Sequence, residues 1–319
     1  MCYSAQIKAS YNKYVRAFGA RMNIDEFFDI FWQRRGDTSI QIPKPLEAEF
    51  LNPQTDRERD IKAEIEWFTN QQKAKYEGEI AKQRERLAKA QTKLAAKATN
   101  SAREEVRIAT KKIGWARGKI DDLLRLEVRP SESRIFPGTY APVMVMEGGE
   151  RVVKLMRYQC RPAGKPACYD TQYPGTYNPR RDSLERFWSQ QFGHSHGIII
   201  FDSFYEVVER HRAEGRSLAP GERIEKAVAE FKLRPEQELL VACIWSRWTS
   251  PGLPDLLSFA AITDEPPPEV LAAGHDRCII PIKPENIDAW MTPNPRDLAP
   301  LHAILDDRVR PFYEHMIVS

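Results

Sequence analysis

The second residue of the chain carries the most distinctive chemistry in the sequence. If Met1 is removed, Cys2 presents a free α-amine and a thiol on adjacent atoms. An α-amine titrates at about pH 8 and a thiol at about pH 8.5, so both can supply nucleophile at cellular pH. With an aldehyde, the amine forms a Schiff base and the thiol then closes a five-membered thiazolidine. Cysteine also occurs at position 2 by chance, so the residue alone leaves both interpretations open.

Three polar residues further along the chain could assist such chemistry. His275 lies in a turn between two apolar strand candidates, where a histidine can move protons near neutral pH. Glu206 ends the segment Asp202–Glu206, directly after an apolar strand, where a partly desolvated carboxyl could act as a general acid. Asn178 lies in a turn-rich segment that could hold it against a ligand. Each also has an ordinary explanation: a structural or exposed histidine, an exposed glutamate and a turn-forming asparagine.

Arginines are candidates for holding phosphate groups, because the guanidinium fork matches phosphate oxygens. Arg180 and Arg181 lie together in a turn-rich segment, and Arg134 lies beside a Phe-Pro-Gly turn. Arginines in such places are also common partners in surface salt bridges. His194 and His196 resemble half of a metal site, but no further ligand stands at a useful spacing. We therefore expect no metal and no cofactor.

The longest element that the sequence predicts is a helical hairpin. From about residue 56 to 127, Ala, Lys, Glu, Arg, Gln and Leu dominate and proline is absent. Small or apolar residues recur from Ala102 to Leu123 at alternating spacings of four and three, which is typical of a coiled-coil seam. Apolar residues seven apart, from Ile80 to Leu94, would face this seam. The two arms are expected to pack antiparallel.

The sequence also predicts where the second arm of the hairpin begins and that the hairpin carries positive charge. Ser101 and Glu104 fit a capping box, which would begin the returning helix. Lys73–Lys119 contains 14 basic and 5 acidic side chains, an excess of nine positive charges. This basic surface could be a solvated coiled-coil face, a nucleic-acid contact or an assembly surface.

The rest of the chain is typical of an α+β domain. After Pro130, short apolar segments alternate with Pro, Gly and Asp clusters, and no regular strand-helix alternation appears, which favours a largely antiparallel sheet. Residues 24–34 predict a helix near the beginning of the chain. The strand candidates are residues 141–147, 151–157, 197–201, 239–245, 257–263 and 278–282.

Composition limits the class of protein. A length of 319 residues with 42% hydrophobic residues excludes a disordered chain and suffices for one large core or two modest ones. The net charge of +3 is too small to indicate nucleic-acid binding by itself. The five cysteines are scattered without a Cys-x-x-Cys pair, and no apolar run approaches the roughly 20 residues of a membrane span. We expect an intracellular, cytoplasmic protein with no membrane partner.

Taken together, the motifs resemble those of the SOS response-associated peptidase (SRAP) family. The likeness covers the first residues and roughly residues 134–290, and it skips the hairpin. In the family's order, the matching motifs are Met1-Cys2, Pro137-Gly138-Thr139, Asn178-Pro179-Arg180, Asp202–Glu206 and His275-Asp276-Arg277.

The resemblance implies both a fold and a function. It implies an SRAP-like, barrel-like α+β core in residues 1–50 and 130–319, interrupted by a hairpin insertion in residues 51–129. It implies a protein of the DNA damage response that binds single-stranded DNA at abasic sites. Such a protein joins covalently, through Cys2, to the aldehyde of the ring-opened sugar. The peptidase in the family's name refers chiefly to removal of Met1.

The resemblance also implies roles for single residues. Cys2 would be the nucleophile, and Asn178 would position its amine or the sugar. Glu206 would move the proton for opening the sugar ring and for reversal, and His275 would assist proton transfers of the Schiff base. The implied DNA contacts are Arg180, Arg181, Arg134 and Arg277.

Two other functions remain open at this point. In an N-terminal-nucleophile amidohydrolase or peptidase, Cys2 would attack an amide and would need an oxyanion hole. In a non-enzymatic assembly protein, the basic hairpin over Lys73–Lys119 would carry the function. On an SRAP-like core, the same hairpin could add a further nucleic-acid or protein contact.

Overall fold

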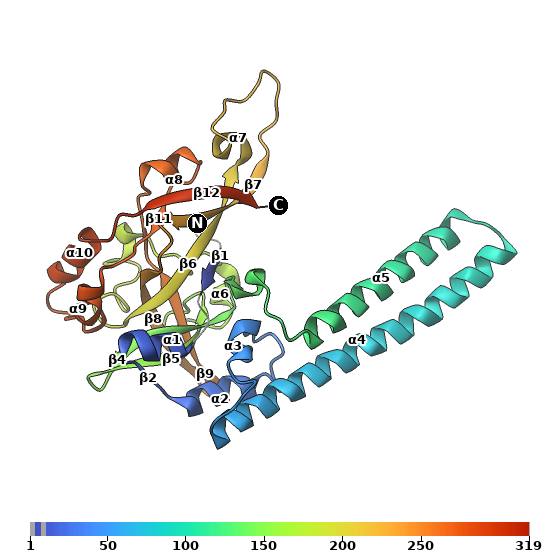
Figure 1. Ribbon diagram of the computed structural model, residues 1–319, viewed down its shortest axis with the longest axis horizontal. Coiled ribbons are helices and arrows are strands. Elements are labelled where there is room, and N and C mark those ends of the chain that lie inside the picture. The colour runs from blue at the N-terminus through green and yellow to red at the C-terminus, as the bar shows by residue number, and fades with distance from the viewer. Residues whose placement is uncertain (1–3, 8–10, 319) are drawn as a thin grey trace.

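In the computed structural model, a large and mostly antiparallel sheet is surrounded by short helices, and one long helical hairpin projects from it (Figure 1). The structure describes residues 4–7 and 11–318. The predicted α+β class is therefore confirmed. No helix within these ranges is both long enough and apolar enough to cross a bilayer.

Five strands of the sheet close into a barrel. β6 (His196–Glu209) pairs with β4 (Tyr140–Glu147), which pairs with β5 (Glu150–Tyr158). β5 pairs with β9 (Leu253–Ala261), β9 with β8 (Leu239–Ser250), and β8 returns to β6. Only the pairing of β5 with β9 in this ring is parallel. Closure removes free strand edges and encloses most of the hydrophobic core.

The second half of β6 leaves the barrel and forms a second arm of the sheet. On one side it pairs with β7 (Lys226–Arg234), which in turn pairs with β12 (Phe312–Val318). On the other side it pairs with β1 (Ser4–Ile7), which also pairs with β3 (Arg134–Ile135). Glu206 therefore lies inside a long strand, opposite Ala229 of β7 and directly after Tyr205, which pairs with Ser4 of β1.

This placement corrects the prediction that Glu206 follows the end of a strand. The sequence indicated a strand only over residues 197–201, because the polar pair Asp202-Ser203 interrupts the apolar run. In the structure β7 and β1 supply backbone partners for residues 203–209 and 203–205, so the strand continues past the polar pair. The predicted strand over 278–282 is likewise shortened to β11 (Cys278–Ile279), which pairs with β10 (Thr263–Asp264).

The hairpin consists of α4 (Asp56–Ala96) and α5 (Asn100–Leu124), which run side by side (Figure 1). The predicted seam is confirmed in part: about half of its small and apolar side chains are buried between the helices, and the others are partly buried. Ile80 of α4 packs there against α5 in a small hydrophobic cluster separate from the main core. From α5 the buried seam residues are Ala102, Ala109, Ile113 and Ala116.

The returning helix begins earlier than predicted. Ser101, the predicted N-cap, lies inside α5, and Thr99 caps the helix by accepting the N–H of Ala102 with its hydroxyl oxygen at 3.2 Å. Glu104 does not reach back to the cap; it binds Arg107 on the next turn. Thr99 has the extended backbone that an N-cap requires, and this geometry decides between the two hydroxyl residues.

The base of the hairpin is fixed to the body of the protein. The first turns of α4 bury Ile61 and Ile65 in the main core. The Arg35 guanidinium binds the Glu64 carboxylate through two hydrogen bonds of 2.6 and 2.7 Å, and Arg34 stacks over the Phe68 ring at 3.7 Å. The outer part of the hairpin extends away from the body (Figure 1).

The remaining elements are short. α2 confirms the helix predicted at residues 24–34. α9 and α10 lie on the opposite side of the body from the hairpin (Figure 1). These elements are α1 (Tyr11–Phe18), β2 (Arg21–Met22), α2 (Ile24–Gln33), α3 (Lys44–Ala48), α6 (Tyr169–Gln172), α7 (Arg210–Ala213), α8 (Pro268–Ala272), α9 (Ile287–Met291) and α10 (Ala299–Asp306). Short 3-10 turns lie at Pro130–Ser133, Arg181–Ser183 and Pro284–Asn286.

Candidate active site

Glu206 and His275 form a buried pair. The Nε2 atom of His275 lies 3.2 Å from Oε1 of Glu206, although 68 residues separate the two in sequence. Their side chains are 7% and 2% exposed. Both groups can carry or release a proton, and burial keeps bulk water from competing for it. The structure therefore brings together two of the four predicted catalytic residues.

The backbone around His275 is set by the end of α8. The N–H of Gly274 donates to the carbonyl of Leu271, and the N–H of His275 donates to the carbonyl of Val270. Gly274 has a φ of +99°, a left-handed conformation that favours glycine. This pair of hydrogen bonds is a Schellman motif, which stops the helix and turns the chain sharply. His275 is thereby directed towards β6.

The first described residues lie beside Glu206. Ser4 of β1 pairs with Tyr205 of β6, the residue directly before Glu206, and Ala5 pairs with Phe204. Ser4 is fully buried, so this end of β1 is part of the folded sheet. Met1 and Cys2 lie outside the described residues.

Asn178 is buried and tightly held. The Tyr158 hydroxyl donates to Oδ1 of Asn178 at 2.9 Å, and the Tyr158 ring stacks on Phe259 at a centroid distance of 5.2 Å. Backbone bonds hold the surrounding segment, with the N–H of Cys160 donating to the Thr176 carbonyl. Sequence reasoning missed Tyr158. Its place at the end of an apolar strand, directly after the predicted segment 151–157, is the signal that could have found it.

Two short strands connect the Asn178 segment with the His275 turn. Thr263 of β10 donates its N–H to the Pro179 carbonyl at 2.8 Å and pairs with Arg180 in a parallel bridge. Thr263 also pairs with Ile279 of β11, the strand that follows the His275 turn. The segments that carry Asn178 and His275 are therefore neighbours in the fold.

Comparison with known proteins identifies a family for the chain. A sequence model of the family "SOS response associated peptidase (SRAP)" matches residues 83–318, about three quarters of the chain. The chain belongs to the SRAP family. Membership supports a role related to DNA damage, and the word peptidase in the family name supports an enzymatic activity. No curated protein matches the sequence of the chain.

Three of the solved structures similar to this SRAP chain come from two bacteria. A protein from Bordetella bronchiseptica is 15% identical, with a TM-score of 0.45, over 59% of this chain and 87% of its own. One from Bacteroides thetaiotaomicron is 13% identical, with a TM-score of 0.45, over 58% and 77%. A phage-related protein from Bordetella bronchiseptica is 19% identical, with a TM-score of 0.43, over 58% and 80%.

Arg134 of this SRAP chain contacts the residue next to Glu206. Its guanidinium lies 3.8 Å above the Tyr205 ring, and its Nε donates to the Ser4 hydroxyl at 2.7 Å. Alternate residues of a strand point to opposite faces, so Tyr205 points away from the face that carries Glu206. Arg134 therefore helps to hold β1 against β6 from the far side of the strand.

The other three predicted DNA-contact arginines differ in how far their side chains are engaged. Arg180 has a side chain that is 40% exposed, with its Nε 3.5 Å from Asp182. Arg181 is bound by two carboxylates, at 2.6 Å from Asp306 and 3.4 Å from Asp264. Arg277 is 19% exposed, and its Nε lies 3.4 Å from Asp276. Arg180 is thus the most accessible of the three.

A hydrogen-bonded cluster that the sequence analysis missed supports the same part of β6. The Tyr205 hydroxyl donates to the Glu230 carboxylate at 2.7 Å, and the Ser203 hydroxyl donates to the same oxygen at 2.8 Å. Burial and the hydrogen bond to Glu230 raise the pKa of Tyr205 to about 12. Tyr205 is therefore a neutral donor at physiological pH. The alternation of Ser203 and Tyr205 on one face of the strand could have indicated this cluster.

The buried cysteines of this SRAP chain are poor nucleophiles. Burial raises the pKa of the Cys160 thiol to about 12 and that of Cys243 well above its ordinary value. Burial also raises the pKa of Cys278 to about 12; a hydrogen bond with Tyr313 opposes this shift and the negative charge of Glu206 adds to it. The three thiols stay protonated at neutral pH, and a thiol reacts as its thiolate.

Neither nitrogen of His196 is directed towards an open metal position. Its Nε2 accepts the N–H of Gly193 at 2.9 Å, and its Nδ1 lies 3.0 Å from the Trp290 carbonyl, to which it must donate. Among the residues that the structure describes, no three metal-ligating side chains come together. The His196 ring is therefore a structural group in the core.

Proposed function

We propose that this SRAP protein recognises abasic sites in single-stranded DNA and shields them by a covalent thiazolidine link through Cys2 after Met1 is removed. The observation that carries this proposal is the buried Glu206–His275 pair beside the first strand of the chain. Cys2 stands two residues before Ser4, and two peptide units span at most about 7 Å. In this proposal, its amine and thiol act beside Glu206.

The proposed reaction needs an aldehyde, a 1,2-aminothiol and proton transfer. The amine of Cys2 attacks the aldehyde carbon of the ring-opened sugar, and the resulting carbinolamine loses water to form an imine. The thiol then adds across the C=N bond, so that an S–C bond forms and the thiol proton passes to nitrogen. One water is released for each link. We assign the proton for opening the sugar ring to Glu206 and the transfers at nitrogen to His275.

The remaining residues have positioning roles in this proposal. Tyr158 fixes the orientation of the Asn178 amide by donating to its Oδ1, and Asn178 would orient the amine or the sugar. Arg180 would contact the DNA backbone, because its side chain is the most accessible of the candidate arginines near the Asn178 segment. Arg181, Arg134 and Arg277 are proposed as further DNA contacts, and Arg181 and Arg134 also hold neighbouring segments of the fold.

We also propose that the hairpin, residues 51–129, is an insertion between the two parts of the core, residues 1–50 and 130–319. The small hydrophobic cluster around Ile80 and Ile113 supports this division, since it is separate from the main core. The packing of Ile61 and Ile65 into the main core supports a free part of the hairpin that begins beyond the first turns of α4.

The proposal is tested by incubating the full chain with a single-stranded oligonucleotide that carries one abasic site. We expect an adduct that survives denaturing electrophoresis and whose mass equals protein plus oligonucleotide minus one water. An oligonucleotide with a tetrahydrofuran abasic analogue, which has no aldehyde, serves as the chemical control. Intact mass must first show that Met1 is absent. Failure of such protein to form the adduct, or an undiminished adduct from Cys2→Ala, would contradict the proposal.

The roles of the buried pair are tested by substitution. We expect Glu206→Gln and His275→Gln each to slow adduct formation by about 10²- to 10⁴-fold, the usual contribution of a positioned acid or base. A matched control pair exists on the surface, where Nε2 of His302 lies 2.7 Å from Oε1 of Glu185. Glu185→Gln and His302→Gln should leave the rate unchanged. If all four variants formed the adduct at the same rate, Glu206 and His275 would have no role in the mechanism.

A further inference from the structure

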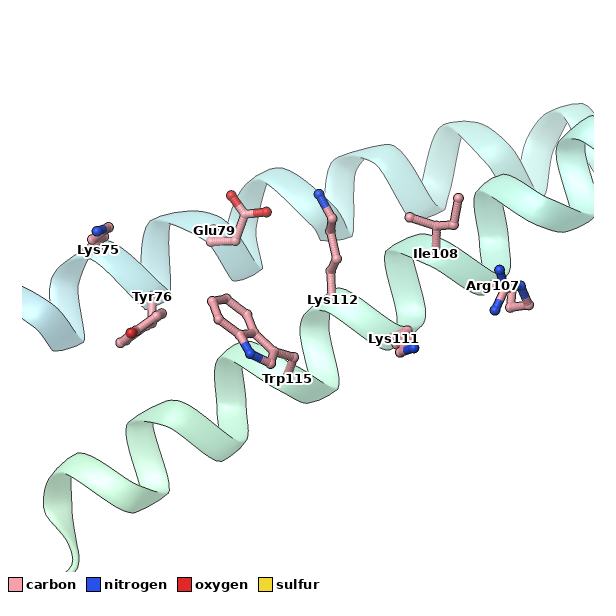
Figure 2. A pocket seen from close by; sticks show the side chains of 8 residues that line it. All are labelled: Lys75, Tyr76, Glu79, Arg107, Ile108, Lys111, Lys112 and Trp115. Atoms are coloured by element: carbon pink, nitrogen blue, oxygen red, sulfur yellow. The ribbon is translucent and has the colours of Figure 1, made fainter. Parts of the chain in front are cut away.

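An open groove runs between the two helices of the hairpin, remote in sequence from the proposed active site. Its volume is about 730 Å³, and the helices diverge beside it towards the body of the protein (Figure 2). The side chains that line the groove are Lys75, Tyr76 and Glu79 of α4 and Arg107, Ile108, Lys111, Lys112 and Trp115 of α5.

Two aromatic rings face one another in this groove. Tyr76 of α4 and Trp115 of α5 make an edge-to-face contact, with centroids 5.5 Å apart and ring planes at 80° (Figure 2). Tyr76 is partly buried against the hairpin cluster, whereas Trp115 remains 53% exposed. An indole that is half exposed on a polar helix presents a flat apolar surface on which a planar ligand can stack.

The charge around the rings is strongly positive. Lys75, Lys111 and Lys112 are exposed and form no ion pair within the described part of the chain. Arg107 also lines the groove but is bound to Glu104 of its own helix. Glu79 is the single acidic side chain among the lining residues. The groove therefore fits an anionic ligand with planar apolar groups.

We infer that this groove binds single-stranded DNA, with a base stacked on Trp115 and phosphates held by Lys75, Lys111 and Lys112. Basic grooves that carry aromatic side chains bind single strands in this way, because every base has a face that can stack. A duplex keeps its bases inside the stack and out of reach of the indole. DNA rather than RNA is the inferred strand, since the family is named for a DNA damage response. This contact needs no abasic site. It extends the proposed function to undamaged single-stranded DNA, which the hairpin would bind.

The inference is tested with the full chain and a fluorescein-labelled ten-nucleotide oligothymidine that has no abasic site, by anisotropy at several salt concentrations. We expect Trp115→Ala to weaken binding by about 5- to 150-fold and Trp115→Phe to weaken it much less, because phenylalanine keeps a stacking ring. The absence of an abasic site makes the result independent of crosslinking. Far-ultraviolet circular dichroism checks that each variant keeps its helices.

A lysine variant keeps the test decisive if Trp115→Ala disturbs the hairpin. Lys111→Gln/Lys112→Gln should make the negative slope of log K against log salt less steep by about 1.4 and should weaken binding about 25-fold at about 0.1 M salt. Lys82→Gln/Lys97→Gln removes the same charge from exposed sites of the hairpin outside the groove and should have a much smaller effect.

Four results would overturn the inference. The first is an equal loss of affinity in the two double-lysine variants, which would show diffuse electrostatic attraction of DNA to the hairpin rather than a binding site. The second is an affinity unchanged by both Trp115→Ala and Lys111→Gln/Lys112→Gln. The third is a duplex or an oligouridine that binds as tightly as oligothymidine. The fourth is an oligoglutamate of equal charge that competes equally well, which would assign the groove to an acidic peptide.

Discussion

Acidification should destabilise this protein through one buried histidine. His196 is 2% exposed, its Nε2 accepts an N–H, and its Nδ1 donates to a carbonyl, so the folded protein holds the neutral ring. A second proton would have to bind Nε2 of His196, and it would then break the hydrogen bond from the N–H of Gly193. Burial lowers the pKa of His196 from 6.5 to about 3, with the hydrogen bond to the Trp290 carbonyl acting in the opposite direction.

The expected magnitude follows from this pKa difference. Below pH 6.5 the unfolded chain takes up a proton that the folded chain refuses until about pH 3, so stability falls as the pH decreases through this window. At about pH 5.0 the difference of about 1.5 pH units corresponds to about 2 kcal/mol of lost unfolding free energy. At about pH 7.5 the unfolded histidine is neutral, and the loss is close to zero.

The assay is urea unfolding followed by circular dichroism at pH 7.5, 6.0 and 5.0. His196→Gln removes the titrating group, and His302→Gln, at a more exposed histidine, is the control. We expect the stability advantage of the wild type over His196→Gln to shrink by about 2 kcal/mol between pH 7.5 and 5.0. The advantage over His302→Gln should not shrink in this way. A wild-type advantage over His196→Gln that stays constant across the range would refute the assignment of a neutral, buried His196.

Substitutions at four further positions have defined outcomes in urea or thermal unfolding. Gly197→Ala would place a methyl group 2.9 Å from a valine side chain of β4 and should lower the free energy of unfolding by about 1–3 kcal/mol. Gly78→Ala lies in open space on α4 and should raise the free energy of unfolding by about 0.5–1 kcal/mol. Equal effects of the two would contradict the packing around β6. Arg134→Met should cost about 1–3 kcal/mol by removing the contact with Tyr205 and a hydrogen bond. Recovery of full stability in Arg134→Lys would argue against the importance of the stacked guanidinium. Thr55→Ala should cost about 1 kcal/mol because it removes the capping box that begins α4; unchanged thermal stability would show that this end of the helix is held by tertiary contacts instead.

The hairpin was the part of the fold most directly predictable from the sequence. Its seam repeats over the whole of the second arm, and a heptad-like repeat constrains local structure and partner together. The start of α5 was predicted less well, because Thr99 and Ser101 both offer a hydroxyl to cap a helix. The choice between them depends on which residue has an extended backbone, and a residue pattern does not specify this.

The candidate site was predictable in its residue types but not in its geometry. The motifs around Asn178, Glu206 and His275 indicated proton transfer and ligand positioning, yet Glu206 was expected at the end of a strand. Its place inside β6 depends on β1 and β7, which lie far away in sequence and supply the backbone partners. The cluster of Tyr205 with Glu230 escaped prediction for the same reason, since only the pairing of β6 with β7 brings the two together.

The sequence by itself determined the family, the α+β class, the hairpin with its seam and basic charge, and the residues that could carry the chemistry. These features follow from local periodicity, composition and the order of motifs. Only the tertiary structure decided that His275 lies 3.2 Å from Glu206, that Ser4 pairs with the residue before Glu206, and that Trp115 lines a groove together with residues of α4. Each of these depends on strand register or on helices meeting at a particular rotation, and contacts between residues far apart in the chain decide both.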